Sequence, residues 1–106
     1  MLHCRRVASV RGPVLVVDGD VDLSSVPQLA DSLGRFVLDH AGARSWLDLD
    51  GVLVLDDAGL GVVLGSVGRA RLHKGDLVVV CSQPRMIERF TLTGFDRAVR
   101  VVAGIA

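Results

Sequence analysis

The stretch WLDLDGVLVLDDAGLG, residues 46–61, decides the fold of this chain. It begins as an apolar run interrupted by single acidic residues, which is typical of a strand, and it ends in an acidic pair followed by glycines. From Leu60 to Ala70 apolar residues recur at helical spacing, and Asp56 or Asp57 can cap the N-terminus of that helix. A strand that leads directly into a helix is the repeating unit of an α/β sheet.

The segments before this stretch predict a strand pair and a helix. Val7–Val10 and Val14–Val17 are short β-branched runs separated by a Gly-Pro turn signal. The sequence SVPQ, residues 25–28, has the form of a capping box with proline in the first turn. Apolar residues then continue at helical spacing as far as a stop at Gly42.

The segments after the stretch continue the alternation. Leu77–Cys81 is wholly apolar, which is typical of a strand buried on both faces. A third helix is expected to begin at Pro84 and to end at Gly94, and Val99–Val102 is expected to be a final strand. We expect the second and third helices to direct apolar side chains inward, namely Leu60, Val63, Leu64, Val67, Ala70, Met86, Ile87 and Phe90.

The order ββαβαβαβ predicts an α/β fold with a mixed, mainly parallel sheet of four to five strands and helices packed against it. Right-handed crossovers bring the loops that follow parallel strands to one edge of the sheet. Asp20 and Asp22 follow the second strand, and Asp56 and Asp57 follow the third. We therefore expect an acidic, gently convex edge around a helix N-terminus, without a deep pocket.

Composition narrows the classes of function. The chain has 106 residues, enough for one domain spanning residues 1–106, and twelve basic residues balance twelve acidic ones. This balance predicts neither nucleic-acid nor membrane binding. No apolar run is long enough for a membrane span or a signal peptide, so we expect a cytoplasmic protein. Cys4 and Cys81 lack metal-ligand spacing; we expect buried thiols, no metal and no cofactor.

One enzymatic interpretation rests on Asp48-Leu49-Asp50-Gly51-Val52-Leu53. This segment resembles the first motif of the haloacid dehalogenase superfamily, in which the first aspartate is a nucleophile and the second a general acid/base of a Mg²⁺-dependent phosphatase. The motif lies mid-chain, and Lys74, the only lysine, ends a helix. The alternative is structural: Asp48 anchors neighbouring backbone, and Asp50-Gly51 forms a turn after a strand. We favour this alternative and expect no enzymatic activity.

From Gly19 to Val102 the sequence resembles the STAS domain family of bacterial anti-sigma factor antagonists. The resemblance rests on five segments in the family's spacing: GDVD (19–22), WLDLDGV (46–52), LDDAGLGVVLG (55–65), KGDLVVVC (74–81) and PRMIERFTLTGF (84–95). It implies a non-catalytic module that binds an anti-sigma factor, itself a serine kinase of the Bergerat ATPase type. Binding frees a sigma factor, and phosphorylation of the antagonist breaks the complex.

The family pattern at the second helix is D-S-S-G-L-G or D-S-x-G-L-G, and its second serine accepts the phosphate. Here Asp56 matches the pattern, Asp57 replaces the first serine, and Ala58 stands at the phosphoacceptor position. The resemblance therefore implies a docking surface that phosphorylation at this position cannot switch. The expected partner-binding residues are Asp20, Asp22, Asp56, Asp57, Ala58, Gly59, Leu60 and Gly61.

Two further expectations concern glycines and assembly. Gly59 and Gly61 lack side chains in the first turn, which would let a partner's backbone approach closely, whereas Gly61, Gly65 and Gly68 would alternatively let the helix pack tightly on the sheet. We expect a monomer or weak dimer. A scaffold subunit that associates with other STAS proteins is an alternative function.

Overall fold

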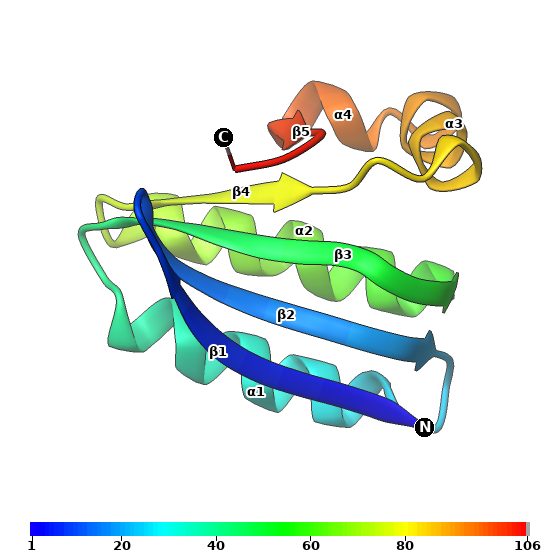
Figure 1. Ribbon diagram of the computed structural model, residues 1–106, viewed down its shortest axis with the longest axis horizontal. Coiled ribbons are helices and arrows are strands. Elements are labelled where there is room, and N and C mark those ends of the chain that lie inside the picture. The colour runs from blue at the N-terminus through cyan, green and yellow to red at the C-terminus, as the bar shows by residue number, and fades with distance from the viewer. Residues whose placement is uncertain (106) are drawn as a thin grey trace.

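The computed structural model describes residues 1–105, which form a five-stranded sheet and its covering helices (Figure 1). The elements in chain order are β1 (Leu2–Ser9), β2 (Gly12–Val21), α1 (Val26–Asp39), β3 (Arg44–Leu55), α2 (Asp57–Leu72), β4 (Asp76–Val80), α3 (Pro84–Thr93), α4 (Phe95–Ala98) and β5 (Val101–Val102).

The strands lie in the order β1-β2-β3-β4-β5. β1 and β2 form an antiparallel hairpin, and every later pairing is parallel. Helices α1 and α2 lie side by side along one face of the sheet, while α3 and α4 lie beyond β4 (Figure 1). The predicted α/β class, the mixed sheet and the ββαβαβαβ order are confirmed; the short α4 is an addition to that order.

The sheet separates two apolar clusters. The larger lies under α1 and α2 and includes fully buried Phe36, Leu47 and Leu77. The smaller lies on the opposite face and consists of Val14, Trp46, Val78 and Val80. Successive side chains of a strand point to opposite faces, so β4 contributes to both clusters. This explains why Leu77–Cys81 is apolar throughout, and the expected burial of this strand on both faces is confirmed.

β3 corrects one sequence expectation. The predicted turn at Asp50-Gly51 is wrong, because β3 continues through both residues to Leu55. Two register shifts against β2 give β3 an extra residue at each point, and bulges of this kind bend a strand without ending it. At Gly51 a Cβ would lie 1.8 Å from Asp18 Oδ1, so this glycine makes room for a neighbouring side chain.

Ser25 corrects a second expectation. Helix α1 begins at Val26 with Pro27 in its first turn, as predicted, but Ser25 makes no side-chain cap. Its Oγ instead donates to Asp20 O at 2.7 Å and accepts from Asp22 N at 3.0 Å. The backbone of Ser25 is already in the right-handed helical region, which turns its hydroxyl back toward the end of β2.

Three further expectations on helix and strand positions are wrong. Leu64 and Ile87, expected to point inward, are exposed at 44% and 39%. The final strand covers only Val101–Val102, because residues 95–98 form α4 before it. Gly94 has a left-handed φ of 77° and serves as the C-cap of α3, so the predicted helix stop is confirmed.

Candidate functional site

The ends of β2 and β3 meet at one edge of the sheet. Val21 pairs with Leu55, and Asp56 N donates to Val21 O at 2.8 Å just beyond that pair. The loop entering α1 and the first turn of α2 therefore lie side by side, and the expectation that the two acidic loops share an edge is confirmed. We call this surface, formed by residues 20–24 and 53–58, the acidic edge.

Local hydrogen bonds build the first turn of α2. Asp56 has an extended backbone, and its Oδ1 accepts from Ala58 N at 3.0 Å, which confirms a cap at this position. Asp57 lies in the first turn, where a carboxylate interacts favourably with the helix dipole. Its Oδ1 accepts from Arg89 Nη2 of α3 at 2.5 Å. Asp57 and Ala58 are both exposed.

The loop after β2 is organised by Asp22. Its Oδ1 accepts from Ser24 Oγ at 2.6 Å, from Ser24 N at 3.0 Å and from Ser25 N at 3.2 Å. The hydrogen bond from the Ser24 hydroxyl is the main reason that the pKa of Asp22 is lowered, because it stabilises the ionised carboxylate. The loop is thus held in one conformation while Asp22 carries its charge.

A first prediction follows from Asp22. Because its pKa is lowered in the folded state, its contribution to stability is present above the unfolded value of 3.8 and is lost as pH falls through the folded value. We expect Ser24→Ala to raise the pKa of Asp22 toward 3.8, as measured by carboxyl carbon NMR against pH. An unchanged Asp22 titration in the variant would contradict this assignment.

Gly59 and Leu60 do not have the exposure expected of partner-binding residues. Both are buried, and a Cβ on Gly59 would lie 2.4 Å from Val21 Cγ1 and 3.1 Å from Leu55 Cδ1. Gly59 therefore allows α2 to pack on the strand ends, and its burial argues against the expectation that it admits a partner's backbone. A Cβ on Gly61, Gly65 or Gly68 would meet nothing within 4 Å, so the tight-packing alternative is wrong for these three.

Exposed apolar side chains at the acidic edge were missed by the sequence analysis. Leu23 is 76% exposed, Leu53 78% and Val54 51%. Asp20 pairs with Val54 and Gly19 with Val52, so Leu53 is the extra residue of a bulge. The signal was present in the unbroken run Val52–Leu55, because a strand cannot direct four consecutive side chains into one core.

Two shallow grooves flank the Asp57–Arg89 ion pair. One, of about 260 Å³, is lined by Leu53 and Val54 of β3 together with α3. The other, of about 520 Å³, lies between Leu60, Gly61 and Leu64 of α2 and Phe95 of α4. Arg89, which the sequence analysis also missed, lines the first groove, and its partner Asp57 lines the second. The surface suits contact with another macromolecule better than enclosure of a small molecule.

The carboxylates of the phosphatase-like motif have structural partners. Asp48 Oδ1 accepts from Asp50 N at 2.9 Å, and Asp50 Oδ1 accepts from Ser82 N at 2.6 Å and Ser82 Oγ at 3.0 Å. Asp48 thus anchors neighbouring backbone as expected, and Asp50 ties β3 to the segment after β4. Within residues 1–105, no group of three His, Cys, Asp or Glu side chains is arranged to hold a metal ion.

The two cysteines differ in burial. Cys81 is buried, as expected, whereas Cys4 is only half-buried, and both are free thiols. Burial raises the pKa of each thiol. Among the helices formed by the described residues, none has the length and apolar character that crossing a membrane requires.

Comparison with known proteins identifies related folds. The model of the STAS domain family matches residues 5–106. An anti-sigma factor antagonist from Mycobacterium paratuberculosis superposes with a TM-score of 0.86 at 23% identity, covering 99% of this chain and 88% of that one. The antagonist SpoIIAA in its unphosphorylated form superposes with a TM-score of 0.69 at 16% identity, covering 97% and 90%. The phosphorylated Bacillus SpoIIAA gives a TM-score of 0.66 at 17% identity, covering 95% and 92%.

Proposed function

The chain belongs to the STAS domain family, and on that premise we propose that it is an anti-sigma factor antagonist that docks through its acidic edge. The partner is an anti-sigma factor of the Bergerat ATPase type with serine kinase activity, and docking releases a sigma factor. In this role the protein is a non-catalytic, cytoplasmic regulator of transcription that acts as a monomer or weak dimer.

The composition of the acidic edge is the observation that carries this proposal. Exposed carboxylates of Asp22 and Asp57 lie beside exposed Leu23, Leu53 and Val54. Apolar side chains supply affinity when a partner covers them, and surrounding charges set partner choice and association rate. Both loops are held by internal hydrogen bonds, so a partner meets a surface that is already ordered.

The position of Ala58 supports an antagonist without the usual switch. SpoIIAA has been solved in unphosphorylated and phosphorylated forms, whereas the position that the resemblance assigns to the phosphoacceptor is here an exposed alanine. Asp57 is a poor substitute for a phosphoserine, because a carboxylate carries less charge than a phosphate and this one is paired with Arg89. We propose that the protein is constantly able to dock.

Restoring the hydroxyl tests this proposal. The protein and its Ala58→Ser variant are incubated with each candidate ATPase anti-sigma factor from the same cell, with and without ATP. We expect both forms to bind one candidate, only the variant to gain phosphate, and only its complex to dissociate with ATP. Binding is measured by calorimetry and phosphate by intact mass spectrometry. An Ala58→Val variant, which also adds side-chain volume but has no hydroxyl, is the matched control.

Other outcomes would disprove either the lack of a phosphorylation switch or the antagonist function itself. Phosphate on the unchanged protein, followed by dissociation, would disprove the switchless antagonist; Ser66 is buried, so exposed hydroxyls such as Thr91 would be examined first. Stable association with other STAS proteins, and with none of the ATPases, would disprove the antagonist and favour the scaffold function.

A further inference from the structure

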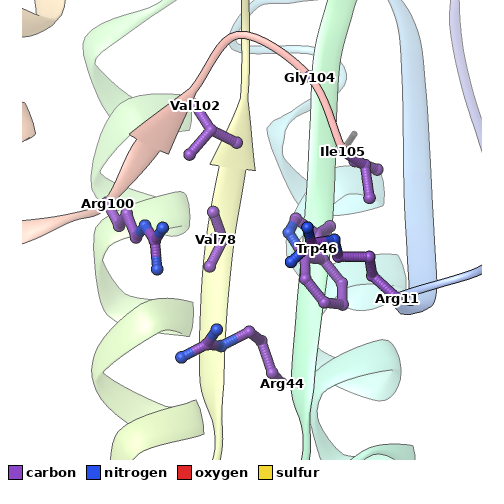
Figure 2. A pocket seen from close by; sticks show the side chains of 8 residues that line it. All are labelled: Arg11, Arg44, Trp46, Val78, Arg100, Val102, Gly104 and Ile105. Carbon is purple, nitrogen blue, oxygen red and sulfur yellow. The ribbon is translucent and has the colours of Figure 1, made fainter.

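The sheet face opposite α1 and α2 carries a small cavity that the proposed function does not use. Its volume is about 160 Å³. Trp46 and Val78 form an apolar floor, and three arginines stand around it (Figure 2). The residues that line it are Arg11, Arg44, Trp46, Val78, Arg100, Val102, Gly104 and Ile105. They come from the β1–β2 turn, β3, β4 and the C-terminal segment, and none belongs to the acidic edge.

Two of the arginines face the cavity without a partner. In residues 1–105, the side chains of Arg44 and Arg100 make no hydrogen bond or ion pair. Figure 2 shows both guanidinium groups directed toward the space over Val78. Two cations that share one space repel each other, and an anion between them removes that repulsion. The lining residues named above include no carboxylate.

The carboxylate beside Arg44 in the sheet is engaged elsewhere. Asp76 is the strand partner of Arg44 in the β3–β4 ladder. Its Oδ1 accepts from Leu77 N at 3.0 Å and from Arg71 Nε at 3.4 Å, and Arg71 belongs to α2 on the other side of the sheet. Asp76 therefore does not form an ion pair with Arg44, and the charges of Arg44 and Arg100 are left for a ligand.

The chemistry of the cavity favours a phosphoryl group. A guanidinium donates two parallel hydrogen bonds to phosphate or carboxylate oxygens. A phosphate monoester carries about −1.5 to −2 charge and three acceptor oxygens, which suits two arginines, whereas a carboxylate carries about −1. Val78 is 1% exposed and Trp46 6%, and an apolar floor of this kind strengthens charge interactions above it. The volume is below the roughly 300–1,000 Å³ of clefts that enclose drug-sized ligands.

We propose that this cavity binds a phosphoryl group, either as inorganic phosphate or as a small phosphate monoester, through Arg44 and Arg100. The apolar floor contacts any small organic part that the ligand carries. Because the site shares no residue with the acidic edge, its binding can be measured without any protein partner.

Trp46 supplies the signal for the test. It is the only tryptophan, and the chain has no tyrosine, so its fluorescence reports on this cavity alone. The protein is titrated with inorganic phosphate and, separately, with glycerol 3-phosphate at constant ionic strength. We expect a saturable change in Trp46 emission with at least one of them. Tighter binding of phosphate identifies the free ion as the preferred ligand, and tighter binding of glycerol 3-phosphate identifies a monoester.

Arginine variants assign the site. We expect Arg44→Gln and Arg100→Gln each to weaken binding about tenfold or more, because each removes charged hydrogen-bond donors. Both arginines are exposed, so the variants should fold, which thermal unfolding checks. Arg97→Gln changes an exposed arginine of α4 outside the cavity and should bind like the unchanged protein. Amide NMR shifts on adding phosphate should be confined to residues around Val78 and Val102.

The proposal is overturned by any of three results. The first is the absence of a saturable change with both ligands. The second is an equal response to sodium chloride at the same ionic strength. The third is equal weakening in Arg97→Gln, which would show attraction to exposed arginines in general and not to this cavity.

Discussion

Replacing Gly59 by alanine is expected to lower the free energy of unfolding by about 1–3 kcal/mol, the usual cost of overpacking a core. The added methyl would lie 2.4 Å from Val21 Cγ1, and Val21 is fully buried. Its β-branched side chain has little freedom to turn away, so α2 must move outward from the strand ends. Alanine's higher helix propensity offsets part of this cost, up to about 1 kcal/mol. Urea denaturation measures the change.

Gly61→Ala is the matched control, because it makes the same change two residues later in the same helix. Its methyl would meet nothing within 4 Å, so we expect the free energy of unfolding to rise by about 0.5–1 kcal/mol. Opposite signs for the two variants would establish that Gly59 serves packing within the chain. Equal effects, or a Gly59→Ala variant that is stable but no longer binds a partner, would restore the docking role that the sequence suggested.

Leu53→Asp is expected to weaken binding to the anti-sigma partner by about thirtyfold, corresponding to ~2 kcal/mol, as for a residue near the centre of an interface. Leu53 is 78% exposed on the bulge of β3; it belongs to the acidic edge and also lines the groove beside α3. The change removes apolar surface and adds a carboxylate to an edge that already carries several. Calorimetry with the partner found in the ATPase binding test measures it.

Leu72→Asp provides the control for Leu53→Asp. Leu72 is 79% exposed but ends α2, far along the helix from Asp57. The two variants therefore carry the same chemical change at equal exposure, and only Leu53→Asp should lose affinity. Equal loss in both would point to charge repulsion alone. Unchanged binding in both would remove the bulge from the docking surface.

The elements could be predicted because their signals are local. The alternation of apolar and acidic residues in Leu47–Asp50 and a period near 3.6 after Leu60 each depend on a few neighbouring residues. The αL cap at Gly94 and the Asp56 cap are also local, since the cap bond to Ala58 N spans two residues. The family resemblance then supplied the docking hypothesis and the importance of Ala58.

The predictions from sequence failed where a polar group or a stretch of backbone bonds to a segment that is distant in the chain. Ser25 looks like a cap from its neighbours, yet its hydroxyl bonds to the end of β2. Asp50-Gly51 looks like a turn, yet the Ser82 hydrogen bond to Asp50 and the pairing of Gly51 with Asp18 of β2 keep the backbone extended. Arg89 gave no signal, because its contact with Asp57 joins residues 32 positions apart.

By itself, the sequence determined the alternation of strands and helices, the acidic residues at the start of α2, and the lack of a hydroxyl at Ala58. Only the tertiary structure decided which of these groups a partner can reach: it buried Gly59, exposed Leu53, and brought Arg44 and Arg100 together over Val78. The physical reason is one of range. Backbone geometry and capping act within a turn of chain, whereas burial and charge pairing depend on segments that meet only when the sheet has formed.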